Sequence, residues 1–286
     1  DWGFDGAVVT DWGGSNDHAL GVKNGSTLEM PFPGGDSIRE LKAAVESGKI
    51  SEADVDARLD ELLELVLDNM HALGFNEKDI RWIVHSHGHI DHLGATKRLR
   101  AMSGAKTAIG RADREHANGT RDLTYAGELG LTYHTAFEPD LLLDDGDTLR
   151  LGNTEMHCLH TAGHTEGTMS YFFRLNVPER GLIAGTHGGI GVNTMSREFL
   201  LAHGLPLSLR DDFRRGLARL RQLHVDVLIP NHQDQWNTAE RYRRKLAGDS
   251  DAFVDAAAWA AYLDMAEQRL DAMLKGEKIC AITEPH

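Results

Sequence analysis

A six-residue run of the pattern H-x-H-x-D-H, at residues 87–92, constrains this chain more than any other part of its sequence. The run directly follows a strand-like segment, residues 81–86. Because side chains two apart on an extended strand point to one face, His87 and His89 should lie together, and a turn beyond them brings the last two residues to a second point in space. Imidazole and carboxylate groups are ligands that zinc takes in proteins. The run therefore predicts two adjacent metal sites, with candidate ligands His87, His89, Asp91 and His92.

A histidine-rich, solvated surface is the alternative interpretation, because the chain has 16 histidines in 286 residues. Composition alone produces this run in fewer than about one in a hundred chains of this make-up. The metal interpretation makes a further demand, since a catalytic zinc takes three protein ligands and keeps one position open for water. Two more donors should therefore lie downstream, in turns that follow strands.

Two downstream histidines meet that demand. His164 stands in a turn flanked by glycines, directly after the strand-like residues 154–160. His232 ends a Pro-Asn-His turn after residues 225–229, whose apolar side chains are typical of a buried strand. Each has a simpler interpretation on its own, since a single histidine after a strand is often an ordinary loop residue. Together with the run, they are the predicted fifth and sixth ligands.

These motifs, in this order and approximate spacing, resemble the metal motifs of the metallo-β-lactamase superfamily over about residues 68–286. The chain most resembles class B enzymes of subclass B3, through its three-histidine first site, residues 69–75 and the C-terminal residues 253–267. The resemblance implies an α/β fold, the αββα sandwich, and two zinc ions with a hydroxide between them that Asp91 orients as a catalytic residue. It places the first zinc on His87, His89 and His164, and the second on Asp91, His92 and His232.

One position separates this subclass from other hydrolases of the fold. Many of those carry a metal-bridging aspartate after a glycine at a strand end, where this chain has Gly185 and Thr186. The lactamase subclass usually has a hydroxyl residue there, so the resemblance implies that Thr186 helps to bind the substrate carboxylate. Gly188 offers no second hydroxyl. The sequence assigns no role to His85 or His187.

Residues 1–67 resemble a different family, the late part of a glycoside hydrolase family three β-glucosidase barrel. Asp11 stands where that family has its nucleophile. A barrel needs all its strands, and a retaining glycosidase needs a second carboxylate about 5 Å away, so Asp11 is expected to be inert. The chain is thus interpreted as a chimera of residues 1–67 and a lactamase-like domain, residues 68–286, that lacks its usual N-terminal strands. The N-terminal α/β fragment either covers that part of the core or leaves the sheet edge open.

Apolar periodicity and capping residues place the remaining elements. Ser37 and Ser51 are expected to cap the first two helices, and the segment Leu200–Pro206 is a candidate mobile wall over the ligand-bearing rim. The expected helices are residues 37–47, 51–73, 93–102, 111–118, 208–223, 237–247 and 251–275, and the expected strands are residues 81–86, 106–109 and several within 141–186.

Composition excludes several classes of protein. A net charge of −14 opposes binding to nucleic acid, and no apolar run is long enough to span a bilayer. Cys158 and Cys280 cannot fix a redox compartment, and Cys158 is expected to be a small core residue. No signal peptide is visible in a chain that begins at Asp1. A periplasmic or secreted location follows only from the resemblance.

Three functional hypotheses remain open at this point. The first is a zinc-dependent β-lactamase that opens the amide of a small β-lactam with a zinc-bound hydroxide. The second is another hydrolase of the same fold, acting on a lactone, thioester or phosphoester. The third is a catalytically impaired chimeric metal-binding protein. Thr186, in place of an aspartate, favours the first over the second.

Overall fold

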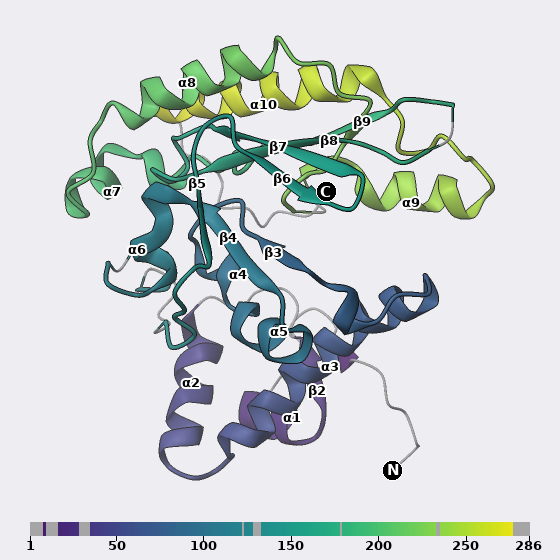
Figure 1. Ribbon diagram of the computed structural model, residues 1–286. Coiled ribbons are helices and arrows are strands. Elements are labelled where there is room, and N and C mark those ends of the chain that lie inside the picture. Colours follow the sequence, from purple (N-terminus) through teal and green to yellow (C-terminus); the bar gives the residue numbers. More distant parts are fainter. Residues whose placement is uncertain are drawn as a thin grey trace.

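Two principal sheets lie face to face between layers of helices (Figure 1). The structure is a computed structural model that describes residues 8–9, 17–28, 35–121, 123–127, 133–177, 179–232 and 235–276. One sheet has the strand order β10-β9-β8-β7-β6, and the other has the order β3-β4-β5. The predicted αββα sandwich is confirmed.

The larger sheet is antiparallel from β6 to β9, and β10 joins β9 in parallel, with Val227 opposite Ala184. Its outer face is covered by α8 (Leu209–Leu220) and α10 (Ala256–Leu274), which pack their apolar faces on it (Figure 1). Trp259 Nε1 donates to the carbonyl of Leu220 at 3.0 Å and so ties α10 to α8. The strands are β6 (Thr148–Leu151), β7 (Thr154–His160), β8 (Met169–Arg174), β9 (Ile183–Thr186) and β10 (Val227–Leu228).

The smaller sheet is parallel throughout. It consists of β3 (Trp82–Val84), β4 (Lys106–Gly110) and β5 (Leu141–Leu143). Two short helices follow β3 in the chain, α4 (Ile90–Leu93) and α5 (Thr96–Ser103).

Apolar side chains fill the space between the two sheets. Cys158 is fully buried there, which confirms the prediction of a core residue, and burial raises the pKa of its thiol to about 11. Tyr171 Oη donates to the carbonyl of His85 at 2.6 Å, so β8 is bound to the end of β3. This bond fixes the loop after β3 against the larger sheet. Cys280 lies outside the described residues.

The N-terminal elements have a small core of their own, formed by Ala19, Ala44 and Ile50. Two short strands, β1 (Val8–Val9) and β2 (Ser26–Leu28), pair in parallel and join neither principal sheet. Among the described strands, β3 is therefore an edge of its sheet. The helices are α1 (His18–Lys23), α2 (Gly35–Glu46) and α3 (Glu52–Ala72), and α1 contacts both of the others.

The two predicted helix caps have different outcomes. Ser51 caps α3 as predicted, because its hydroxyl accepts from Asp54 N and the Asp54 carboxylate accepts from Ser51 N. The prediction for Ser37 is wrong. Helix α2 begins at Gly35, so Ser37 already has a helical backbone, whereas an N-cap residue has an extended one. Asp11 lies outside the described residues.

Four other expected elements differ in detail. The helix expected at residues 93–102 is two helices, since the backbone turns at Gly94 and α4 already begins at Ile90. The expected mobile wall begins inside a helix, α7 (Arg197–Ala202). The stretch 111–118 is a 3-10 turn, η2 (Arg111–Asp113), followed by α6 (Arg114–Ala117), and the helix expected at 237–247 is α9 (Thr238–Leu246). Two further 3-10 turns are η1 (Glu77–Asp79) and η4 (Asn193–Met195). No helix in the described ranges is both long and apolar enough to cross a bilayer.

Helix α3 offers a matched pair of neighbours that tests how its buried side is packed. Leu67 is 7% exposed, and Val66 is 52% exposed. Leu67→Asp should lower the free energy of unfolding by about 3–5 kcal/mol, because it places an unpaired charge in a buried position. Val66→Asp should change it by less than about 0.5 kcal/mol. Urea unfolding followed by circular dichroism measures both values, and equal losses for the two variants would contradict this assignment of the buried side.

Candidate metal centre

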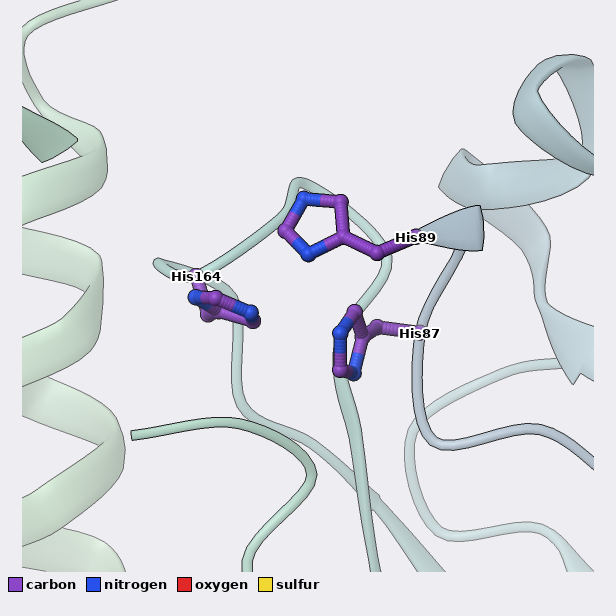
Figure 2. A group of neighbouring side chains, drawn as sticks. All are labelled: His87, His89 and His164. Carbon is purple, nitrogen blue, oxygen red and sulfur yellow. The ribbon is translucent and has the colours of Figure 1, made fainter. Parts of the chain in front are cut away.

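Three stretches, far apart in the chain, bring the six predicted ligands to one rim of the sandwich. The loop after β3 carries His87 and His89, and α4 carries the next two ligands in its single turn. His164 follows β7, and His232 follows β10. The predicted first site consists of His87, His89 and His164. Figure 2 shows that the rings of these three histidines point toward one another.

Donor atoms in the first group lie within 4.8 Å of one another. The ring centroids of His87 and His89 are 4.6 Å apart, and that of His164 is 4.5 Å from each of them. This compact triangle is what a three-histidine metal site requires.

The second group adjoins the first, and His87 belongs to both. Donor atoms of His87, Asp91 and His92 also lie within 4.8 Å of one another. Asp91 Oδ2 is 3.3 Å from His92 Nε2 and 3.6 Å from His232 Nε2. The structure therefore brings all six candidate ligands together.

Backbone carbonyls fix which ring nitrogen faces the centre. His87 Nδ1 lies 2.7 Å from the carbonyl of Gly188, and His164 Nδ1 lies 2.8 Å from the carbonyl of Gly191. Because a carbonyl oxygen only accepts, both Nδ1 atoms must donate, which leaves each neutral ring with a lone pair on Nε2. His87 Nε2 and His92 Nε2 are buried and have no hydrogen-bond partner among the described residues. Buried lone pairs that converge in this way fit a metal ion.

The charge states of the candidate ligands also suit the binding of a metal ion. Burial lowers the pKa of His87 and His89 well below the usual value, and the surrounding imidazoles add to the effect. Desolvation lowers the pKa of His164 to about 4, so at neutral pH these rings are neutral, as metal ligands must be. Burial alone would raise the pKa of Asp91, but the interaction with His92 and the other imidazoles outweighs it, and the net pKa is lowered. Asp91 is therefore ionised at neutral pH.

Comparison with known proteins identifies the family. The sequence profile described as the metallo-beta-lactamase superfamily matches residues 33–232. The chain belongs to the metallo-beta-lactamase superfamily. The match begins at residue 33, inside the part that resembles a glycosidase.

Solved structures of metallo-beta-lactamases have the same fold as this chain. A Cronobacter sakazakii metallo-beta-lactamase with a HARLDQ motif is 28% identical, with a TM-score of 0.62, and the match covers 74% of this chain and 82% of that one. BJP-1, a subclass B3 metallo-beta-lactamase of Bradyrhizobium japonicum, is 22% identical, with a TM-score of 0.64 and coverage of 74% and 79%. The second likeness shows the fold alone. The resemblance to metallo-beta-lactamases stated from the sequence is thus confirmed for the superfamily and the fold, and one neighbour in structure is a subclass B3 enzyme.

Two sequence relatives match shorter stretches. A Burkholderia pseudomallei protein described as a probable metallo-hydrolase is 40% identical over 96 residues, which are 32% of this chain and 31% of the relative. A β-glucosidase of Rhizobium radiobacter is 42% identical over 66 residues, which are 23% of this chain and 8% of the relative. The chain therefore spans less than a third of either relative. The second match confirms the glycosidase-like piece.

Sequence reasoning missed a buried carboxylate that joins two ligand loops of this superfamily member. Asp113 is fully buried. Its Oδ2 accepts from Gly88 N at 2.8 Å and from Thr165 Oγ1 at 2.6 Å, and its Oδ1 accepts from Gly167 N at 2.7 Å. Asp113 thus connects the loop of His87 and His89 to the loop of His164. Its position in a charged stretch gave no signal, because that stretch reads as an exposed helix.

A second residue that the sequence did not single out is His116, which is buried beside the candidate centre. Neither of its ring nitrogens has a hydrogen-bond partner in the described part of the chain. A Cβ at Gly88 would lie 2.5 Å from His116 Nδ1, so only glycine fits between the first two ligands. His116 also lines the pocket next to the centre, together with His89, Leu123, His164, Thr165, Glu166, Thr194, Phe199 and Leu205.

The residues that the sequence left open are also placed. His85 is a structural residue, since Nδ1 donates to the carbonyl of Ala108 at 3.2 Å and Nε2 accepts from Thr96 Oγ1 at 2.7 Å. Thr186 ends β9, is half-buried, and donates to the carbonyl of His187 at 3.3 Å. It does not line the pocket described above, so its role toward a substrate stays a prediction.

Proposed function

We propose that this protein is a zinc-dependent hydrolase that opens the amide of a β-lactam, with two zinc ions bound by the six residues at the rim. The observation that carries the proposal is the pair of adjacent ligand groups that share His87. Membership of the superfamily and the likeness to the Cronobacter metallo-beta-lactamase support the reaction class. The choice of zinc rests on the donor set, since imidazole nitrogens with one carboxylate suit zinc better than magnesium or calcium.

The chain's own residues divide the work of such a reaction. When bound, zinc lowers the pKa of a coordinated water to about 7 and so supplies a nucleophile at neutral pH. His87, His89 and His164 would hold one ion, and Asp91, His92 and His232 the other. The ionised Asp91 would accept a hydrogen bond from the nucleophile and keep it aimed at the substrate carbonyl. The apolar side chains of Phe199 and Leu205, which line the adjoining pocket, would exclude water from that side.

Thr186 remains the proposed contact for the substrate carboxylate. Its hydroxyl makes only a long bond of 3.3 Å to the carbonyl of His187, and a rotation about one side-chain torsion frees it. A threonine cannot bridge two metals as a carboxylate does, which weighs against a phosphodiesterase. A lactone, thioester or phosphoester hydrolase is the second candidate, and the match to a probable metallo-hydrolase favours keeping it.

Nitrocefin hydrolysis tests the proposal directly. Protein purified without chelator should open nitrocefin, lose that activity on dialysis against a chelator, and regain it with zinc. His134→Ala should behave in the same way in all three steps, because His134 is exposed and lies outside the six candidate ligands. Zinc-loaded protein that leaves nitrocefin intact but cleaves a thioester or lactone would establish the second candidate instead.

The glycosidase-like piece leads to a separate prediction. We propose that residues 1–67 act as a scaffold beside a metal-binding domain of residues 68–286. The match to a β-glucosidase covers only 8% of that enzyme, so the barrel and the acid/base carboxylate are not supplied by it. Asp11→Ala should leave nitrocefin turnover unchanged, and neither protein should release p-nitrophenol from its β-glucoside. Glucoside cleavage that disappears in Asp11→Ala would show a working glycosidase.

A further inference from the structure

One short segment, residues 188–191, touches both candidate ligands whose ring nitrogens are fixed by carbonyls. Gly188 supplies the acceptor for His87, and Gly191 supplies the acceptor for His164. These two carbonyls are three residues apart, so the position of one segment sets the orientation of two rings. Outer-shell acceptors of this kind fix the tautomer of a metal-ligating histidine and influence how strongly it binds.

The segment packs too closely to shift without moving those rings. A Cβ at Gly188 would lie 2.2 Å from the carbonyl oxygen of Met169. A Cβ at Gly189 or Gly191 would lie 2.4 Å or 2.8 Å from the ring of His164. The chain can therefore take this path only with glycine at all three positions, and glycine brings a loss of backbone entropy on folding. The side chain of Ile190, which is fully buried in the core, anchors the segment between Gly189 and Gly191, and hydrogen bonds to the backbone add to that hold.

His187, immediately before the segment, makes a hydrogen bond to the segment's backbone. Its ring is fully buried, and its Nδ1 accepts from Gly189 N at 3.0 Å. Because Nδ1 accepts, the proton of the neutral ring must be on Nε2. Burial lowers the pKa of His187 to about 3, which keeps the ring neutral.

The rest of the ring gains no hydrogen bond. His187 Nε2 is buried without a partner among the residues that the structure describes. A buried donor left in that way destabilises the folded state. An apolar side chain would fill the same space without that cost, so the bond to Gly189 N is what the imidazole contributes.

Two other hydrogen bonds hold the first residue of the same segment. Gly188 N donates to Ser170 Oγ at 3.2 Å, and Asn231 Nδ2 donates to the carbonyl of Gly188 at 3.2 Å. Asn231 directly precedes His232, so the segment also contacts the turn that carries the sixth candidate ligand. Among the hydrogen bonds of the described residues, the one to His187 is the bond that reaches Gly189, inside the segment.

We propose that His187 is a positioning residue: by holding Gly189 N it aims the carbonyls of Gly188 and Gly191 at His87 and His164, so that both rings present Nε2 to a metal. The inference rests on the proposed metal centre. It concerns hydrogen bonding and tautomers, and so it can be tested without any turnover of substrate.

Two substitutions separate the acceptor from the bulk of the ring. His187→Leu fills the space and removes the acceptor. His187→Asn is smaller but keeps an acceptor, because an asparagine side chain commonly bonds to the backbone N–H two residues on. In competition with a chromophoric chelator, the dissociation constant for zinc should be at least about tenfold higher for His187→Leu than for the unmodified protein. His187→Asn should bind zinc more tightly than His187→Leu, although it leaves more empty space. Equal affinity in His187→Leu and the unmodified protein would overturn the proposal.

Nitrogen-15 spectra of the unmodified, metal-free protein give a second test that needs no variant to fold. His187 should be protonated on Nε2, and His87 and His164 should be protonated on Nδ1. A His187 ring protonated on Nδ1 would refute the proposal, since that atom could not accept from Gly189 N. Protein that shows these tautomers and binds zinc, yet leaves nitrocefin and other esters and amides intact, would refute the proposed function and leave this inference standing.

Discussion

His87→Ala should have the largest effect of any single substitution in this chain, lowering kcat/KM for nitrocefin by about a thousandfold or more. His87 is a proposed ligand of the first zinc, and its donor atom also lies within 4.8 Å of those of Asp91 and His92, so its loss should disturb both proposed sites. A bound metal contributes several kcal/mol to catalysis, and each 1.36 kcal/mol corresponds to a factor of ten in rate. Metal analysis by mass spectrometry should show fewer zinc ions per chain than in the unmodified protein.

Histidine at an exposed position provides the control for that experiment. His134→Ala should retain both zinc and activity, because His134 is exposed on the surface. If His87→Ala keeps its full complement of zinc and its activity, the six-residue centre is not where the metal binds. If it loses zinc but keeps nitrocefin turnover, hydrolysis does not depend on the metal.

Asp113→Leu should have the largest effect on stability. The substitution removes the carboxylate that accepts three hydrogen bonds, from Gly88 N, Thr165 Oγ1 and Gly167 N. Hydrogen bonds to a charged group contribute about 1.5–3 kcal/mol each, so the loss of all three should lower the free energy of unfolding by about 5 kcal/mol or more. At about 2–4 °C for each kcal/mol, the melting temperature should fall by about 10 °C or more.

Two further variants sharpen this result. Asp113→Asn keeps one acceptor oxygen and should lose less stability than Asp113→Leu. Asp211→Leu changes an exposed carboxylate, and its melting temperature should stay within about 2 °C of the original. Because Asp113 joins two ligand loops, zinc affinity should fall together with melting temperature in Asp113→Leu. Unchanged zinc affinity in a folded Asp113→Leu protein would show that the two loops are held independently of this carboxylate.

The candidate ligand set could be predicted from the sequence because each part of it is encoded locally. Four of the six candidate ligands lie within residues 87–92, and the other two follow strands that their apolar residues reveal. The sandwich could be inferred for the same reason, through its motifs and alternating strands. The convergence of the candidate ligands at one rim depends on pairings between distant segments, such as that of β10 with β9, and no local pattern shows such pairings.

The residues that escaped sequence reasoning act through bonds to the backbone. Asp113 accepts from two main-chain N–H groups of distant loops, and the carbonyls of Gly188 and Gly191 orient two rings. The residue type does not show which partner a backbone carbonyl will have, and it does not show whether an aspartate is buried or exposed. The error at Ser37 has a similar origin, since a capping pattern shows that a helix can begin there but not that an earlier start is excluded.

The candidate ligands span residues 87–232, and this has a consequence for how the protein folds. His232 can join the others only after β10 has paired with β9, which closes a long loop and is therefore slow. We therefore expect zinc to enter late, when nearly all of the chain is in place. Zinc would then act by slowing the unfolding of a finished molecule more than by guiding an early intermediate, and adding it during refolding should leave the folding rate almost unchanged.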